Sequence, residues 1–268
     1  MSDGAVRSSQ GSSAIAARFT QLKTAKRRAL VPYVTAGHPD AERTVALIQG
    51  LQEAGADVIE LGLPFSDPLA DGAVIQASSQ RALELGMNFD RLLELVARAR
   101  PSVPLVMMTY LNPILAAGPD ALTRAASAGF SGLLLIDLPV GADPEREAWV
   151  GESPLAFIRL VAPTTPRERM AEIAAHGSGF VYLISSLGVT GMRDTISADL
   201  PATVKMLREE ATLPVCVGFG VSGPEQAAAV ARIADGVVVG SAIVKAAGES
   251  VAAALTLTAS LRAAIDAV

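Results

Sequence analysis

Ala56-Asp-Val-Ile-Glu-Leu-Gly-Leu-Pro-Phe-Ser-Asp-Pro-Leu-Ala-Asp-Gly72 is a short apolar run that continues into a loop rich in Pro, Gly, Ser and Asp. Glu60 closes the run, and Asp71 stands at the far end of the loop. In an α/β barrel, catalytic groups lie at the carboxyl ends of strands and in the loops just beyond. We therefore take Glu60 and Asp71 as a candidate catalytic pair, although Glu60 alone is equally typical of a surface strand.

Seven more apolar runs are spread along the chain, and segments with helical spacing separate them. The eight runs are residues 30–35, 56–61, 104–109, 132–137, 155–161, 179–185, 215–220 and 236–240. The expected helices are residues 12–28, 44–54, 76–85, 89–99, 121–128, 144–150, 166–175, 200–210 and 225–231, and an Ala-rich helix from Val251. This alternation predicts parallel strands joined by helical crossovers.

Eight such units predict an α/β fold, a closed (β/α)8 or TIM barrel. We expect a single domain over residues 1–268, with an extra N-terminal helix and a flexible segment at residues 1–11. An open, doubly wound sheet is the competing layout, but no G-x-G-x-x-G follows the first strand, which is evidence against its dinucleotide-binding version. Asp143 and Thr165 each precede a proline and are expected to cap helices.

The amino-acid composition and net charge of the chain exclude several classes of protein. Half of the 268 residues are hydrophobic and the mean hydropathy is +0.39, which suits a sheet buried on both faces. No long stretch is free of polar side chains, so no membrane span is predicted. The net charge of −5 is evidence against a nucleic-acid partner. Cys216 is expected to be a core residue. His38 and His176 do not have the spacing of metal ligands. No signal peptide is recognisable. We expect a metal-free cytoplasmic protein.

Two glycine-bearing strand ends predict a phosphate site. Val217-Gly-Phe-Gly-Val-Ser-Gly-Pro-Glu225 follows the seventh run, and Val239-Gly-Ser-Ala-Ile-Val-Lys245 follows the eighth. Barrel enzymes often bind phosphate between these loops, where glycines allow backbone N–H groups to approach the oxygens. Ser241 is expected to cap the helix and offer its hydroxyl. The simpler interpretation is a pair of tight turns, but the motif occurs at both expected positions.

Large side chains at strand ends predict a pocket for a flat apolar group. They are Tyr33, Met108, Tyr182 and Phe219. On the sequence alone, these residues are better explained as barrel core. The long loop at residues 186–196 has the length typical of a lid over an active site.

The stretch at residues 60–72 resembles the central motif of the tryptophan synthase alpha chain family. Four further motifs are similar: Val31-Pro-Tyr-Val-Thr-Ala-Gly37, Gly188-Val-Thr-Gly191, Val217-Gly-Phe-Gly-Val-Ser222 and Gly240-Ser-Ala-Ile-Val-Lys245. The similarity extends from about residue 14 to the C-terminus. It implies a barrel lyase that cleaves indole-3-glycerol phosphate to indole and glyceraldehyde 3-phosphate in tryptophan biosynthesis. It also implies a beta chain that carries pyridoxal phosphate in an α2β2 complex, with no cofactor in this chain.

The resemblance assigns a role to each matching residue. Glu60 is similar to the family's acid–base group, and Asp71 to the group that accepts the indole N–H. Tyr182 matches a tyrosine over the site. The matches to the phosphate and pocket positions are Phe219, Gly220, Gly191, Gly240 and Ser241. The residues expected at the partner interface are Pro64, Asp67, Tyr110, Asn112 and Pro139.

The sequence also departs from the family pattern. Tyr33 stands where some members have Phe, and Met108 where some have Leu; both changes keep the pocket apolar. His38, Ala73 and Ser186 also differ from the frequent residues, and they affect the expected closure of the lid rather than the chemistry.

Two alternative functions are left open. One is another phosphate-binding barrel enzyme of amino-acid biosynthesis, although the motif at 60–72 does not look like theirs. The other is a non-catalytic barrel subunit that activates a partner enzyme, and the presence of both carboxylates is evidence against it.

Overall fold

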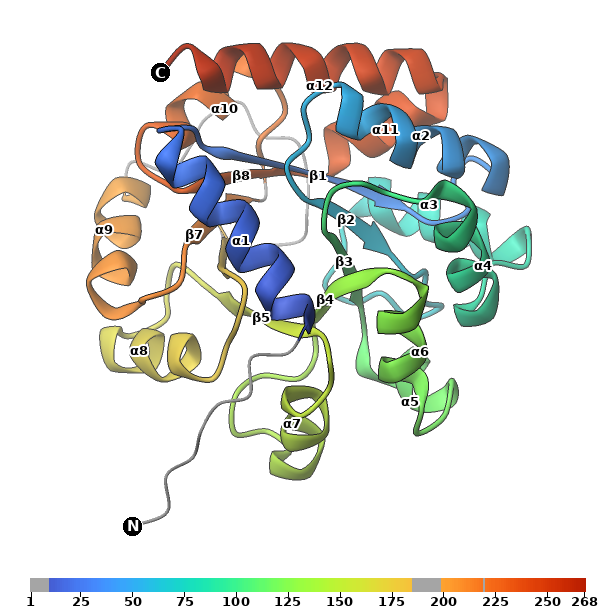
Figure 1. Cartoon of the computed structure of the whole chain (residues 1–268), viewed down its shortest axis with the longest axis horizontal. Helices are drawn as coiled ribbons and strands as arrows, with labels where there is room; N and C mark the ends of the chain where they lie inside the picture. Colours follow the sequence, from blue (N-terminus) through green and yellow to red (C-terminus); the bar gives the residue numbers. More distant parts are fainter. Residues whose placement is uncertain (1–9, 185–198, 219) are drawn as a thin grey trace.

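The computed structural model describes residues 10–184, 199–218 and 220–268, in which eight parallel strands close into a barrel (Figure 1). The strands are β1 (Ala29–Thr35), β2 (Ile59–Gly62), β3 (Leu105–Thr109), β4 (Phe130–Leu135), β5 (Ala156–Val161), β6 (Val181–Ile184), β7 (Val215–Gly218) and β8 (Gly236–Val239). Each strand pairs with the next, and β8 returns to β1 with Ala29 opposite Gly236. The predicted (β/α)8 barrel is confirmed.

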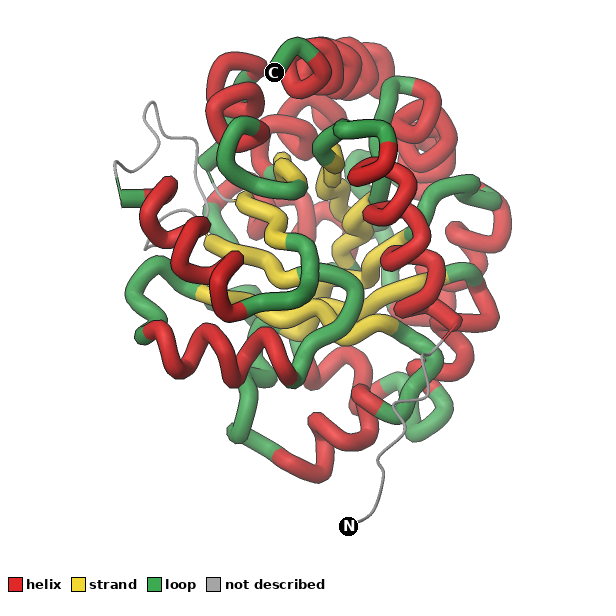
Figure 2. The backbone as a smooth tube through the Cα atoms, turned by 60° about the vertical axis from the view of Figure 1, so that its left-hand side comes forward, coloured by secondary structure: helices red, strands yellow, loops and turns green. Residues whose placement is uncertain are grey.

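Helices surround the strands on the outside of the barrel (Figure 2). They are α1 (Gln10–Thr24), α2 (Ala41–Glu53), α3 (Ala73–Glu84), α4 (Phe89–Ala99), α5 (Leu111–Ala116), α6 (Ala121–Ala128), α7 (Pro144–Gly151), α8 (Arg167–Ala175), α9 (Leu200–Glu210), α10 (Pro224–Ala231), α11 (Ser241–Glu249) and α12 (Val251–Asp266). Among the described residues, no helix combines the length and the apolar character that crossing a membrane requires.

The barrel has one apolar core inside it and another between strands and helices. Alternate residues of a strand face opposite sides. On β1, Val31 and Tyr33 belong to the inner cluster, whereas Leu30 and Val34 belong to the outer one. Both faces of the sheet are therefore buried, which accounts for the high mean hydropathy.

Helix α1 closes the amino end of the barrel. Ile15, Phe19 and Leu22 are buried and belong to the inner cluster, and the Phe19 ring lies 5.8 Å from that of Phe180. Figure 1 shows the helix crossing the barrel in front of the strands. The extra N-terminal helix is thus part of the barrel core.

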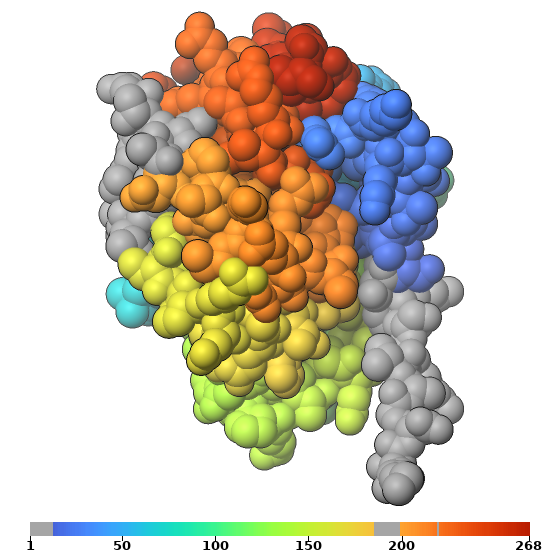
Figure 3. Space-filling model, turned by 90° about the vertical axis from the view of Figure 1, so that its left-hand side faces the viewer, coloured from blue at the N-terminus to red at the C-terminus, as the bar shows by residue number. Residues whose placement is uncertain are grey.

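A buried carboxylate, Asp57, joins the beginning and the end of the chain. It accepts hydrogen bonds from Arg18 of α1 at 2.6 Å and from Arg262 of α12 at 2.9 Å. Nearby, Arg27 pairs with Asp266 at 3.0 Å. In the space-filling view, the N-terminal (blue) and C-terminal (red) segments lie beside each other (Figure 3).

Side-chain caps explain where several helices begin. Asp40, Asn88, Asp143 and Ser250 each accept a hydrogen bond from the backbone N–H three residues later. The prediction for Asp143 is confirmed. The prediction for Thr165 is wrong, because α8 begins one residue later, after Pro166, and the Thr165 hydroxyl instead accepts the N–H of Ala162.

The predicted bounds of many helices and strands differ from the structure by one to three residues, and two larger differences remain. The first helix ends at Thr24 rather than at residue 28, because Lys26 has a left-handed backbone with φ of 54°. Helix α5 was not predicted, because its six residues include Pro113 and are too few to show a helical period.

Candidate active site

Glu60 lies inside the barrel. It is the second residue of β2, opposite Tyr33 in the register of β1 and β2. The side chain is only 1% exposed, and neither carboxylate oxygen has a hydrogen-bond partner among the described residues. Loss of water around the charged form raises the pKa of Glu60 to about 8. The carboxyl group is therefore mostly protonated at neutral pH and is suited to give a proton to a substrate.

Asp71 is the second carboxylate of the site. It is 5% exposed, and burial raises its pKa to about 6. The Tyr110 hydroxyl donates to Asp71 Oδ2 at 3.3 Å and opposes that rise. Tyr110 in turn accepts the N–H of Ala70 at 3.0 Å, and Gln76 donates to the Asp71 carbonyl at 2.7 Å. These contacts hold Asp71 in place, ionised at neutral pH.

Three of the predicted pocket residues line the barrel interior beside Glu60. Tyr33, Met108 and Tyr182 are between 4% and 7% exposed and belong to the inner cluster. A side chain at Gly62 would collide with the Tyr33 hydroxyl, and one at Gly218 with the Tyr182 hydroxyl. Both glycines therefore make room for a tyrosine ring at the mouth of the barrel.

The loops after β7 and β8 each end at a helix N-terminus. Gly220 has φ of 88°, which favours glycine, and Gly223 is the N-cap of α10. Gly240 is the N-cap of α11, so the prediction that Ser241 caps this helix is wrong: Ser241 is its first residue. The Ser241 side chain is partly exposed there, beside N–H groups that favour an anion.

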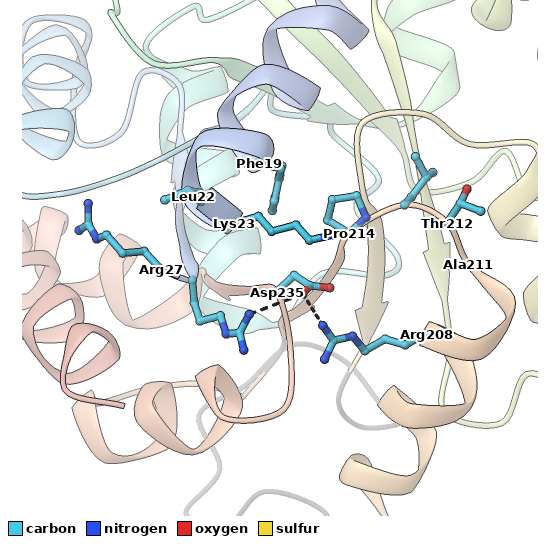
Figure 4. Close-up of a pocket in the computed structure, with 11 residues that line it drawn as sticks. Phe19, Leu22, Lys23, Arg27, Arg208, Ala211, Thr212, Pro214 and Asp235 are labelled. Atoms are coloured by element: carbon cyan, nitrogen blue, oxygen red, sulfur yellow. Dashed lines mark hydrogen bonds and ion pairs between the residues drawn. The ribbon is translucent and has the colours of Figure 1, made fainter. Parts of the chain in front are cut away.

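A hollow of about 280 Å³ lies at the opposite end of the barrel, below β1, β7 and β8. Figure 4 shows Arg208 directed at Asp235, with a nitrogen–oxygen distance of 2.6 Å, and Arg28 lies 3.8 Å from the same carboxylate. Arg208 and Arg28 also donate to the carbonyls of Ile233 and Ala231. Arg208 and Arg28 are thus already paired with a carboxylate and with backbone carbonyls. We therefore do not interpret the hollow as a ligand site.

The model of the tryptophan synthase alpha chain family matches residues 19–266. The chain belongs to the tryptophan synthase alpha chain family. It is 49% identical over 236 residues to the tryptophan synthase alpha chain of Geobacter sulfurreducens, which covers 87% of this chain and 89% of the relative. It is 46% identical over 258 residues to that of Laribacter hongkongensis, with 93% and 98% covered.

Solved structures of tryptophan synthase agree in fold. One from Mycobacterium tuberculosis has a TM-score of 0.87 and 37% identity, and covers 94% of this chain and 97% of its own. A tryptophan synthase alpha subunit from Legionella pneumophila has a TM-score of 0.86 and 37% identity, and covers 95% and 98%. The resemblance based on residues 60–72 is thereby confirmed, as are the lyase class and the place in tryptophan biosynthesis.

The residues matched to the alpha chain family fall into three groups. Those inside the barrel or at its mouth are Glu60, Asp71, Tyr33, Met108, Tyr182, Gly220, Gly240 and Ser241. Gly191, Phe219 and the predicted lid lie outside the described residues. Of the expected interface residues, Asp67, Asn112 and Pro139 are exposed, whereas Pro64 and Tyr110 are buried.

Sequence reasoning missed two features of this site. It assigned Tyr110 to the partner interface, which stays a prediction, and it did not foresee that the Tyr110 hydroxyl donates to Asp71. Tyr110 directly follows the third strand, so the rule applied to other strand-end residues could have found it. Thr35 and Ser78, whose hydroxyls lie 2.7 Å apart behind Tyr33, gave no signal in the sequence. Cys216 is fully buried and its pKa is raised by burial, which agrees with its expected role as a core residue.

Proposed function

We propose that the chain is a tryptophan synthase alpha subunit in which Glu60 and Asp71 carry out the cleavage of indole-3-glycerol phosphate to indole and glyceraldehyde 3-phosphate. The observation that carries this proposal is the state of Glu60: a carboxyl group inside the barrel with both oxygens unpartnered among the described residues and a pKa raised to about 8. A buried acid of this kind is suited to protonate carbon.

The reaction can be written with the groups of this chain. Glu60 gives its proton to the ring carbon that bears the side chain, and the positive charge develops on the ring nitrogen. Asp71 accepts the ring N–H and stabilises that charge. Glu60 then takes the proton of the side-chain hydroxyl as the carbon–carbon bond breaks. The electron pair of the broken bond restores the indole ring, and the former hydroxyl carbon becomes the aldehyde of glyceraldehyde 3-phosphate.

Substrate binding divides between a ring pocket and a phosphate site. We assign the ring to Tyr33, Met108, Tyr182 and Phe219. We assign the phosphate to Gly191, Gly220, Gly240 and Ser241. Support for the phosphate site comes from the N-terminus of α11, whose N–H groups and dipole favour an anion.

We propose a beta chain as the partner, in an α2β2 complex located in the cytoplasm. The reaction above uses only acid–base groups, so we propose no cofactor for this chain and assign pyridoxal phosphate to the beta chain. Residues 1–268 would act as one domain in that complex. Size-exclusion chromatography of the chain with its beta chain tests the assembly: separate elution of the two would contradict it.

The proposed interface combines the loop after β2 with the segments after β3 and β4. Pro64, Asp67, Tyr110, Asn112 and Pro139 are the residues we assign to it. Leu69 supports the choice of the first loop, because its side chain is 87% exposed between Asp67 and the site residue Asp71. An apolar side chain this exposed beside the mouth of the barrel is suited to burial against a partner.

An indole-release assay on the isolated chain tests the chemistry. We expect the wild-type chain to release indole from indole-3-glycerol phosphate, and Glu60→Gln to lower turnover by about 10²–10⁴-fold, because glutamine keeps the shape but transfers no proton. Glu84→Gln, an exposed position on α3, is the matched control and should leave turnover unchanged. Near-normal turnover of Glu60→Gln would contradict the assignment, and a wild-type chain inactive even with its beta chain would favour a non-catalytic subunit.

A further inference from the structure

Three buried hydroxyl groups form a chain at the carboxyl end of β1. The Tyr33 hydroxyl lies 3.3 Å from Thr35 Oγ1, and Thr35 Oγ1 lies 2.7 Å from Ser78 Oγ. Ser78 Oγ lies 2.8 Å from the carbonyl oxygen of Ile75. All three side chains are at most 5% exposed. The chain thus connects the wall of the ring pocket to the interior of α3.

The proton of each hydroxyl in this chain can be assigned by counting. A carbonyl oxygen only accepts, so Ser78 must donate its single proton to Ile75. Thr35 must then donate to Ser78, because Ser78 has no second proton. Tyr33 must donate to Thr35 for the same reason. The Tyr33 oxygen is therefore left with lone pairs, and it makes no other hydrogen bond with the described residues.

The oxygen of Tyr33 lies on the reaction side of the barrel. Tyr33 is opposite Glu60 in the strand register, and its hydroxyl occupies the space above Gly62 that a side chain would fill. Burial, and after it the charge of Asp71, raises the pKa of Tyr33, so the phenol stays protonated. An uncharged acceptor is thus held near both carboxylates at the wall of the ring pocket.

We propose that Tyr33 is a specificity-determining residue whose oxygen, fixed as an acceptor by Thr35 and Ser78, favours indole rings that carry a hydroxyl substituent. The proposal rests on the proposed function, because that function supplies the ring pocket. A phenylalanine at this position would present only C–H groups. A ligand that donates a hydrogen bond to a buried acceptor binds more tightly than one that leaves the acceptor unpaired.

Equilibrium binding of substituted indoles tests this inference. The dissociation constants of indole and of 4-, 5-, 6- and 7-hydroxyindole are measured for the wild-type chain, Tyr33→Phe and Thr258→Val. For at least one isomer, we expect the affinity relative to indole to fall about tenfold in Tyr33→Phe. Thr258→Val is the matched control and should leave that ratio unchanged, because it removes a buried hydroxyl that donates to the carbonyl of Ala254 within α12, outside the ring pocket.

Fluoroindoles check the direction of the hydrogen bond. Fluorine cannot donate, so a fluoroindole substituted at the favoured position should gain nothing from Tyr33. An equal gain for fluorine and hydroxyl would mean that Tyr33 donates, and it would overturn the proposal. Unchanged ratios in Tyr33→Phe, with indole still bound, would overturn it too and leave the proposed function standing. Failure of indole itself to bind would instead contradict the ring pocket.

Discussion

Asp71 and Tyr110 together determine the acid side of the expected pH profile. The pKa of Asp71 is about 6, because burial raises it and the hydrogen bond from Tyr110 lowers it. In the proposed reaction the ionised carboxylate is the active form, so kcat/KM should rise with pH through this value. Tyr110→Phe removes a donor to the carboxylate, which raises the pKa of Asp71 further. We expect the acid limb to move to higher pH by up to about one unit.

The measurement is kcat/KM for indole release between pH 5 and pH 9. The alkaline limb, which we assign to loss of the Glu60 proton near pH 8, should stay in place and serve as an internal control. A uniform loss of activity with both limbs unmoved would mean that Tyr110 does not act through Asp71.

Among single residues, the sequence predicted those whose position depends only on their neighbours along the chain. Glu60 and Asp71 are recognisable because one ends a strand and the other stands in the loop that follows. The contact between Tyr110 and Asp71 joins residues 39 positions apart, and the pairing of β2 with β3 brings their strands together. No spacing rule contains that information.

Helix α11 is the element whose first turn carries the proposed phosphate site. Ser241→Asp would place a negative charge among N–H groups that favour an anion, so it should weaken binding of a phosphate-bearing substrate analogue. Ser250→Asp is the matched control, because Asp is also a good N-cap for α12 and lies outside the site. The inhibition constant of the analogue measures the effect. An equal change in both variants would contradict the assignment of the phosphate site to this loop.

The loop between β2 and α3 is the element that we expect to contact the beta chain. Its Pro64 and Pro68 restrict the unbound loop, which lowers the entropy lost on binding. Asp67 is exposed and offers a charge to a basic partner residue. Asp67→Ala should reduce activation by the beta chain more than it reduces the activity of the isolated chain. Both rates are measured, and an equal loss in the two would mean that the loop serves only the active site.

The ends of helices show how precisely a sequence pattern predicts secondary structure. Helix α6 and helix α9 begin and end at the predicted residues, since clear breaks flank both. The caps of α8 and α11 were misplaced by one residue, because a hydroxyl next to a helix start can bond elsewhere, as Thr165 does. Backbone geometry, not residue type, selected Pro166 and Gly240 as the N-caps.

The stability of the whole molecule should depend strongly on Asp57. It is 1% exposed and pairs with Arg18 and Arg262, so Asp57→Asn removes the counter-charge of the part-buried Arg18 and leaves the buried Arg262 with Asp266 as its remaining carboxylate among the described residues. We expect a loss of about 3–5 kcal/mol in the free energy of unfolding, measured with urea. Asp90→Asn is the control: it removes an exposed pair with Arg124 and should cost less than about 1 kcal/mol. Similar losses in the two variants would contradict a special role for Asp57.

The number of strands, and with it the closed barrel, was predictable because every described strand is mostly apolar, with charged residues only at Glu60 and Arg159. The ion pairs around Asp57 were not, because Arg262 lies 205 positions away along the chain. Helix α1 was predicted as an addition to the barrel, and its role in filling the amino end depends on Ile15 and Phe19 entering the inner cluster. Such contacts form only when the barrel closes, so no local pattern in the sequence predicts them.

The pairing of β1 with β8 has a consequence for synthesis on the ribosome. The chain emerges from its amino end, so β1 is made early, while Gly236, the first residue of its partner strand, is made late. During that interval β1 exposes an unpaired edge, which is a template for association with other chains. Arg262, which neutralises Asp57, appears later still. A nascent or truncated chain that ends before β8 should therefore be prone to aggregation and a client of chaperones.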